Sequence, residues 1–292
     1  MKKKFALGPV LWGSLSFILG AALTSYVAAR ELKYLQANPQ IVTPRVSPQF
    51  PVIYFFSSVV VIGLILFLIP ASKLKLVFRT LFVLMYAWGV FVVLTFILQS
   101  HLILISIIAV AAGLVWFLRP SVWLQNILML LALAGIGAAF GILISPWPVM
   151  IFLLIVAVYD FLAVRFGYMM WMAKKLSQSG SLPAFVIPKT KSNWNQDLKS
   201  KNSLSIVEGE ASERDYSILG GGDVGFPLIL MVSISANYGF GSSLIVAAFS
   251  LIGLISAFVI QSLFLKGKPM PALPPIAVSS LIGLLLVLYV IK

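Results

Sequence analysis

The sequence contains no cysteine and only one histidine, His101. Without cysteine, the chain has no disulfide framework, no thiolate nucleophile and no cysteine-based metal site. A single histidine argues against a metal site or a catalytic triad built on that residue type. We therefore expect no metal and no other cofactor.

Charged residues are also scarce. They make up 10% of the chain, whereas hydrophobic residues make up 61% and the mean hydropathy is +1.06. Soluble domains carry about 25% charged residues, so this composition indicates a polytopic membrane protein. The net charge of +13 does not indicate nucleic-acid binding, because the basic residues lie between apolar runs and no basic fold motif accompanies them.

The apolar segments predict an all-α polytopic membrane protein with nine transmembrane helices. A spanning helix needs about 20 predominantly apolar residues. Polar, glycine and proline residues at 98–101, 145–148 and 237–243 divide three apolar runs that are too long for one span. The predicted spans are 5–28, 51–70, 77–98, 102–119, 124–144, 148–167, 217–237, 243–265 and 273–291.

The distribution of basic residues predicts the orientation. Cytoplasmic loops carry an excess of lysine and arginine, and we predict a cytoplasmic N-terminus and an extracytoplasmic C-terminus. With this orientation, all 21 Lys and Arg residues lie on the cytoplasmic side except Arg30, Lys33, Arg45 and Lys292. The first span begins like a secretory signal, but its apolar part is longer than the roughly 7–15 residues of such a signal, which favours a retained helix.

The chain divides into two halves and one long hydrophilic loop. Residues 1–147 are predicted to form an N-terminal bundle of five helices, and residues 148–292 a half with helices six to nine that includes the cytoplasmic loop 174–215. In this loop LPAFVIP (182–188) and SLSIVEGE (203–210) look like short strands. Two interpretations stay open: a partly disordered loop, or a loop that offers a strand edge to an extended peptide.

Of the eight acidic residues, only Asp160 and Asp223 fall within predicted spans. An ionisable side chain at membrane depth is costly and therefore indicates function. Asp160 precedes Arg165 by five residues, about 7 Å along a helix, and Asp223 follows Asp215 by eight residues, about 12 Å. Because both segments meet the cytoplasmic face, we expect the two carboxylates at similar depth, where they can face each other.

The chemistry of such a pair leaves alternatives open. Two facing carboxylates in a low dielectric share one proton. In aspartic proteases the charged carboxylate takes a proton from water while the protonated one polarises the peptide carbonyl. A proton-coupled transporter or ion-leak channel would use the same pair as a relay. Asp160 could also pair with Arg165, although a long side chain near a helix end tends to reach the interface.

Two further segments bear on this choice. GGGDVG (220–225) has the form of a dinucleotide-binding pattern, but that pattern needs a βαβ setting, whereas here it opens a span. Glycine before Asp223 instead permits close approach and a flexible backbone, which a peptide substrate needs in order to reach the carboxylates. The prolines of KPMPALPPIAV (268–278) resist helix, so this segment is either a loop with a helix start or an unwound segment that lines the site.

Taken in order, these motifs resemble the YD, GxGD and PAL signatures of the presenilin and signal peptide peptidase family of intramembrane aspartyl proteases. The residues that carry the resemblance are Tyr159-Asp160, Gly220-Gly221-Gly222-Asp223 and Pro271-Ala272-Leu273-Pro274. The large loop between the sixth and seventh spans also matches the family. The resemblance covers 148–291 well, whereas the first five spans match only in number and hydropathy.

The resemblance implies that the protein hydrolyses peptide bonds within transmembrane segments of other membrane proteins, with water as the nucleophile. The catalytic pair would be Asp160 and Asp223. Residues that support the active site would be Tyr159, Gly220, Gly221 and Gly222. Residues that bind the substrate would be Pro271, Ala272, Leu273 and Pro274.

The expected partners follow from this implied activity. We expect transmembrane-helix proteins or peptides as substrates, contact with the lipid bilayer, and no nucleic-acid partner. The expected location is the cell membrane. The predicted orientation and Pro274 look presenilin-like, whereas Pro227 looks like the peptidase branch. The compact chain is similar to microbial homologues, which would act without obligatory partner subunits, and the oligomeric state stays open.

Overall fold

A computed structural model describes residues 7–41, 49–68, 71–99, 101–168, 171–172, 182–188, 191–198, 216–263 and 270–291. An α-helix lies over each predicted span. Short 3₁₀ and π segments, η1 (Lys191–Asn195) and η3 (Val287–Ile291), complete the helical elements. The α-helices are α1 (Leu7–Ala37), α2 (Gln49–Leu68), α3 (Ala71–Leu98), α4 (Leu102–Leu118), α5 (Val122–Leu143), α6 (Pro146–Arg165), α8 (Gly221–Tyr238), α9 (Phe240–Leu263) and α10 (Leu273–Leu286).

Within the described ranges, six helices are long and apolar enough to cross a membrane. The helix α4 is equally apolar but has only 17 residues. The count of nine crossings and the orientation of the termini stay predictions. The six candidate segments are Gly8–Ala37, Leu76–Leu98, Val122–Leu143, Pro146–Arg165, Phe240–Leu263 and Leu273–Val290.

The first helix is longer than the predicted span 5–28. It has 31 residues, about 46 Å at the α-helical rise, so it exceeds the roughly 30 Å of a hydrocarbon core. Glu31, which lies beyond the predicted span, is on the last turns of this helix, and Arg30 beside it donates to the hydroxyl of Tyr26 at 2.9 Å. The helix ends next to Pro39, because the residue before a proline is pushed out of helical conformation.

The seventh predicted span, 217–237, does not begin as a helix. It begins as strand β2 (Tyr216–Gly220), which pairs antiparallel with β1 (Ala184–Pro188). The fold is therefore mostly helical but not all-α. The strand expected in 182–188 is confirmed for 184–188, whereas 203–210 lies outside the described residues. Aromatic and β-branched side chains favour strand at Tyr216 and Ile218, and the glycines that follow end it.

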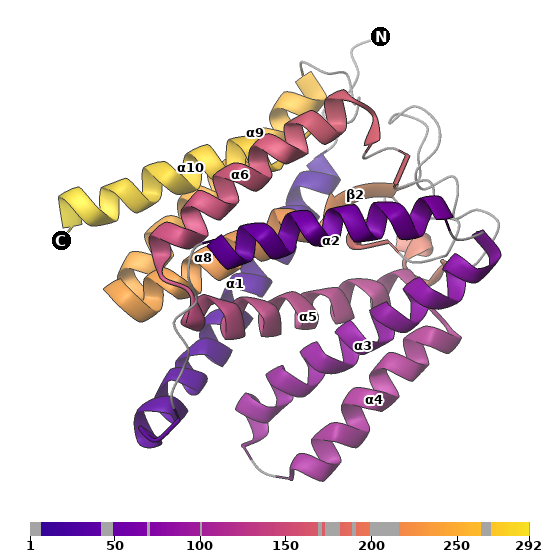
Figure 1. The fold of residues 1–292 in the computed structure, drawn as a ribbon, viewed down its shortest axis with the longest axis horizontal. Coiled ribbons are helices and arrows are strands. Elements are labelled where there is room, and N and C mark those ends of the chain that lie inside the picture. Colours follow the sequence, from indigo (N-terminus) through magenta and orange to yellow (C-terminus); the bar gives the residue numbers. More distant parts are fainter. Residues whose placement is uncertain are drawn as a thin grey trace.

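The helices pack in two groups with α8 between them (Figure 1). In one group α3 lies beside α4 and α5, and in the other α10 lies beside α6 and α9. The largest hydrophobic cluster contains Trp116, Tyr86 and Phe82, whose rings pack at centroid distances of 5.1–5.8 Å. This cluster also contains Val224 and Leu228 of α8, so the core crosses the boundary predicted at 147/148.

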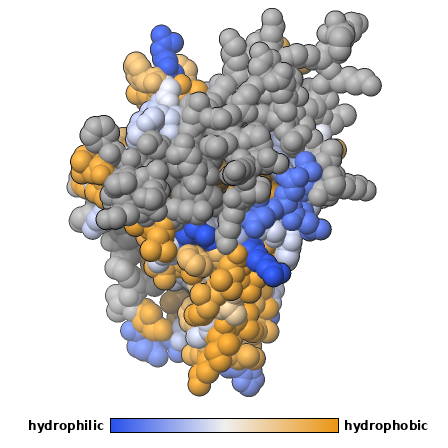
Figure 2. Space-filling view, turned by 90° about the vertical axis from the view of Figure 1, so that its right-hand side faces the viewer, coloured by the Kyte–Doolittle hydropathy of each residue, from blue (hydrophilic) through white to orange (hydrophobic). Residues whose placement is uncertain are grey.

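The strands lie at one end of the molecule, on the right in Figure 1. Figure 2 views this end and shows a band of hydrophilic residues across its middle, next to an apolar surface below. Exposed polar residues of the described chain near the strands include Asn195, Gln196 and Asp197. The backbone of Asp197 forms a bridge with Ser121 at the start of α5. This bridge connects the polar segment around Asp197 to the start of α5.

Gly89 of α3 gives a direct test of this packing. A Cβ atom at Gly89 would lie 2.3 Å from the Cα and 2.8 Å from the nitrogen of Ala132 in α5. These are backbone atoms, so the two helices must separate, and Gly89→Ala is expected to lower the free energy of unfolding by about 1–3 kcal/mol. Thermal unfolding in detergent measures this loss. Gly8→Ala, with no neighbouring atom within 4 Å, is the matched control, and equal unfolding of the two variants would contradict the packing.

Candidate active site

Asp160 is a buried carboxylate in the last third of α6. Its side chain is 3% exposed. The backbone N–H of Leu273, the first residue of α10, donates to its Oδ2 atom at 3.3 Å. Arg165 is exposed, and within the described part of the chain no ion pair joins it to Asp160. The partner of Asp160 is therefore the start of α10, and not the nearby arginine.

Tyr159 faces a different element from Asp160. Its ring meets the ring of Phe56 in α2, with centroids 6.1 Å apart and planes at 88°. An edge-to-face pair of this kind is a favourable aromatic contact. Tyr159 thus connects the helix that carries Asp160 to α2, and its supporting role stays a prediction.

Asp223 lies in the first turn of α8, three residues beyond the last residue of β2. It is half-buried, and its Oδ2 atom accepts a hydrogen bond from the backbone N–H of Gly220 at 3.2 Å. An acidic side chain at this position caps the helix by reaching back to the N-cap N–H. A Cβ atom at Gly220 would lie 2.9 Å from the same Oδ2 atom, so the first glycine of the motif leaves room for the carboxylate.

The other two glycines are also in close contacts. The N–H of Gly221 donates to the carbonyl of Pro183 at 2.9 Å, and a Cβ atom at Gly221 would come within 3.1 Å of that oxygen. A Cβ atom at Gly222 would lie 3.0 Å from the ring of Phe226. Pro227, farther along α8, lacks the N–H that would bond the carbonyl of Asp223 in a regular helix.

The segment before α10 is partly unwound. Met270 and Pro271 have no regular structure, Ala272 is the N-cap, and the helix begins at Leu273. Proline is tolerated in the first turn of a helix, because its missing N–H would have no partner there. This explains how Pro274 can follow directly inside α10. Irregular backbone at 270–272 followed by a helix from Leu273 fits both expectations, a loop with a helix start and an unwound segment beside the site, and 268–269 lie outside the described residues.

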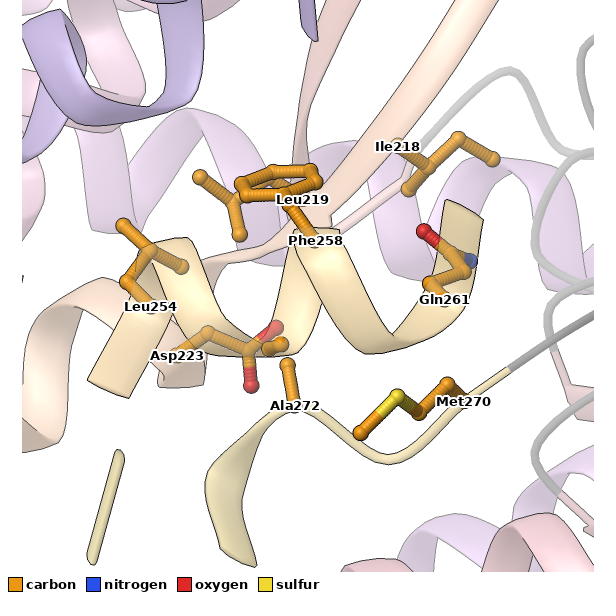
Figure 3. Close-up of a pocket in the computed structure, with 9 residues that line it drawn as sticks. Ile218, Leu219, Asp223, Leu254, Phe258, Gln261, Met270 and Ala272 are labelled. Carbon is orange, nitrogen blue, oxygen red and sulfur yellow. The ribbon is translucent and has the colours of Figure 1, made fainter. Parts of the chain in front are cut away.

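The same short segment lies against both carboxylates. Leu273 bonds to Asp160, and its neighbour Ala272 lines a cavity that also contains Asp223. In Figure 3 the carboxylate of Asp223 points toward Ala272. The structure therefore brings together the two predicted acids and the Ala272-Leu273 part of the predicted substrate-binding segment.

Each carboxylate also lies at the start of a helix. Asp223 is in the first turn of α8, and Asp160 accepts a hydrogen bond from the first residue of α10. Backbone N–H groups at a helix start have no partner within the helix and carry partial positive charge, so they favour a negative group. The fold thus supplies backbone N–H donors to the buried Asp160 and to the half-buried Asp223.

The cavity beside Asp223 includes residues that the sequence did not single out. One face of α9 contributes four side chains at helical spacing, and β2 contributes two more. Apart from the polar Gln261, these residues carry no sequence signal, because α9 is apolar on several sides and its cavity face looks like any packing face. The lining residues are Ile218, Leu219, Asp223, Leu254, Ala257, Phe258, Gln261, Met270 and Ala272 (Figure 3).

The described residues contain no group of three His, Asp or Glu side chains that could hold a metal ion. The site chemistry that the described side chains offer is therefore that of two carboxyl groups in a largely apolar setting. Such a pair can exchange protons with a bound water and with a carbonyl oxygen.

Two solved structures share this fold. Each is described as a presenilin family intramembrane aspartate protease, one in a C222 and one in a P2 space group. The first has a TM-score of 0.64 at 20% identity and covers 95% of this chain and 98% of its own. The second has a TM-score of 0.60 at 22% identity and covers 96% and 97%. No curated protein matches this chain in sequence. The class that fold and composition define is a multi-pass helical membrane protein.

The family follows from the sequence itself. The sequence pattern of the family described as "Signal-peptide peptidase, presenilin aspartyl protease" matches residues 16–292. The chain therefore belongs to this family, and it is an intramembrane aspartic endopeptidase. The resemblance seen in the three short motifs is confirmed, and the match extends to most of the first five helices, which the motifs did not reach.

Proposed function

We propose that this protein hydrolyses peptide bonds within the transmembrane segments of other membrane proteins, with Asp160 and Asp223 as the catalytic pair and water as the nucleophile. The observation that carries the proposal is the placement of the two carboxylates. They come from different helices, α6 and α8, and lie against the neighbouring residues Leu273 and Ala272 of one unwound segment. They are also the two acids for which the sequence predicts a similar depth in the membrane.

The reaction needs one shared proton. The charged carboxylate takes a proton from water as the water oxygen attacks the carbonyl carbon, and the protonated carboxyl gives its proton to the carbonyl oxygen. In the second step one hydroxyl of the tetrahedral carbon returns its proton to the second carboxylate as the carbonyl re-forms, the C–N bond breaks, and the nitrogen leaves with the proton of the first carboxyl. The products are a new carboxyl terminus and a new amine, and the dyad again holds one proton. Neither aspartate is assigned a fixed protonation state, because the pair titrates as a unit.

The open edge of β2 is the proposed docking site for the substrate backbone. In the antiparallel register Val186 lies opposite Ile218, and both backbone groups of Val186 bond to Asn126 of α5, away from β2. In such a non-bonded pair the N–H and C=O of the opposite residue also point away. The backbone groups of Ile218 therefore face outward, with no bonding partner among the described residues. An extended peptide can add as a further strand at this edge.

The size of the cavity sets a condition on the substrate. Its volume is about 60 Å³, which is room for a few water molecules only. A substrate helix about 10 Å wide does not fit. The scissile segment must therefore unwind, and neighbouring side chains such as Met270 and Phe258 must move before a peptide carbonyl reaches Asp223.

The remaining roles follow from these contacts. The three glycines support the site because they have no Cβ atom. Gly220 leaves room for the carboxylate of Asp223, Gly221 for the carbonyl of Pro183, and Gly222 for the ring of Phe226. The segment from Pro271 to Pro274 binds the substrate next to the dyad. The proposed location is the cell membrane, with the protease acting on transmembrane-helix proteins without obligatory partner subunits.

Purified protein in liposomes with a single-span model peptide tests the proposal. We expect two product fragments whose new termini lie within the apolar part of the peptide, identified by mass spectrometry. Proton flux through the same liposomes, followed with a pH-sensitive dye, is expected to equal that of empty liposomes. An intact peptide together with pH-dependent flux would contradict the protease and favour a proton-coupled transporter or channel.

A further inference from the structure

Two adjacent polar side chains interrupt the apolar sequence of α5 near its start. Gln125 is fully buried, and Asn126 is half-buried. A buried polar side chain is costly unless it is hydrogen-bonded. Both are bonded to strand β1, and neither is a part of the dyad, the glycine motif or the unwound segment before α10.

Asn126 holds both backbone groups of one strand residue. Its Nδ2 atom donates to the carbonyl of Val186 at 2.8 Å, and its Oδ1 atom accepts from the N–H of Val186 at 2.8 Å. A residue in an antiparallel sheet makes this same pair of hydrogen bonds with a residue on the next strand. The carboxamide of Asn126 thus stands where a further strand would lie on the outer side of β1.

Gln125 continues the same edge. Its Nε2 atom donates to the carbonyl of Leu182 at 2.8 Å and to that of Ala184 at 3.4 Å. Its Oε1 atom accepts from the indole N–H of Trp116 at 2.8 Å, a fully buried residue of α4. Every second residue of 182–186 is therefore fixed from the helical side, and β1 has no open edge there.

Strand β1 is connected to Asp223 through the hairpin. Ala184 lies opposite Gly220 in the register of the hairpin. The N–H of Gly221 donates to the carbonyl of Pro183, and the N–H of Gly220 donates to the carboxylate of Asp223. A displacement of β1 relative to α5 must therefore move β2 and, with it, the carboxylate.

We propose that Asn126 is a positioning residue that takes the place of a neighbouring strand on β1, and so fixes the register of β2 and the place of Asp223. The effect on cleavage rests on the proposed function. Because a slip of two residues keeps the same faces of a strand buried, a loosened hairpin can offer the substrate a second register. Loss of Asn126 is therefore expected to change where the substrate is cut as well as how fast.

The test compares Asn126→Leu, Asn126→Gln and the matched control Asn237→Leu in the purified full-length protein. Leucine has a similar size but no hydrogen bonds, whereas glutamine keeps the carboxamide. Asn237 lies exposed near the end of α8, and its side chain donates to the carbonyl of Ser233 in the same helix at 2.8 Å. The measured quantities are hydrogen exchange of the peptide 182–188 and, with a single-span model peptide, kcat, KM and the positions of the new termini.

For Asn126→Leu we expect exchange in 182–188 to rise at least tenfold while exchange in α3 and α9 stays unchanged. We also expect kcat to fall about tenfold or more and a second cleavage position to appear, with KM changed less than kcat. Asn126→Gln is expected to keep the wild-type cleavage position, and Asn237→Leu all wild-type values. A single wild-type cleavage position and unchanged kcat in Asn126→Leu would overturn the proposal, even if exchange rises. Unchanged exchange would overturn it as well.

A wild-type protein that cuts no peptide would defeat the proposed function but would still leave a result for the role of Asn126. Exchange in 182–188 would then show alone whether Asn126 holds β1. If Asn126→Leu does not fold, Asn126→Gln still decides the matter, because new cleavage positions in a folded glutamine variant contradict a role carried by the carboxamide.

Discussion

Asp160→Asn and Asp223→Asn are each expected to lower kcat for cleavage on the order of 10⁴-fold while the protein stays folded. Asparagine has nearly the shape of aspartate but cannot accept the proton of the attacking water or give one to the carbonyl oxygen. The hydrogen bonds from Leu273 and Gly220 can still be accepted by the amide oxygen. The loss is therefore one of chemistry and not of structure.

The double variant sharpens this prediction. Residues that act as a unit show strongly non-additive losses, so the variant with both substitutions is expected to be no slower than either single variant. Asp197→Asn, at an exposed acid, is the control and is expected to keep activity within about twofold. Cleavage of the single-span peptide by either single variant at more than about a tenth of the wild-type rate would contradict the catalytic pair.

Gly253→Ala is expected to lower kcat about 100-fold although it lies outside the cavity. A Cβ atom at Gly253 of α9 would lie 2.6 Å from the Cα of Ile276 and 2.7 Å from the carbonyl oxygen of Pro275. Both atoms are backbone in the first turn of α10, so this turn must move away from α9. The first turn of α10 also contains Leu273, whose N–H donates to Asp160. A shift of about 1 Å at a catalytic group can lower the rate about 100-fold.

Stability and rate must be separated in this test. The same crowding is expected to lower the free energy of unfolding by about 1–3 kcal/mol, so the folded fraction at the assay temperature is measured by circular dichroism. Gly241→Ala lies in the same helix with no atom within 4 Å and is expected to behave like the wild type. A rate loss in Gly253→Ala that only matches its unfolded fraction would show that α10 does not need this close contact for catalysis.

Part of the fold and site could be predicted from the sequence, because a membrane imposes strong constraints. Uncharged apolar runs indicated the helices, and the scarcity of acids in these runs singled out Asp160 and Asp223. Their similar depth in the membrane stays a prediction from helix rise. The unwinding before α10 followed from prolines that resist helix.

Other features depend on contacts that a local pattern does not contain. The start of α8 was predicted too early, since Ile218 and Leu219 are apolar enough for a span, and only pairing with β1 makes this segment a strand. The end of α1 was also predicted too early, because hydropathy marks where the apolar run stops and not where the helix stops. The polar pair Gln125 and Asn126 was visible in the sequence, but its partner is a strand that begins more than fifty residues later.

The most direct test of the account is the mass of the products formed in ¹⁸O-labelled water by wild-type protein and a single-span peptide. Hydrolysis by the aspartyl pair predicts two fragments that together weigh one water more than the substrate, with one ¹⁸O atom in the new carboxyl terminus. It also predicts that Asp160→Asn and Asp223→Asn give neither fragment. An uncut peptide with the wild type, or labelled fragments that form equally well with the asparagine variants, would contradict it.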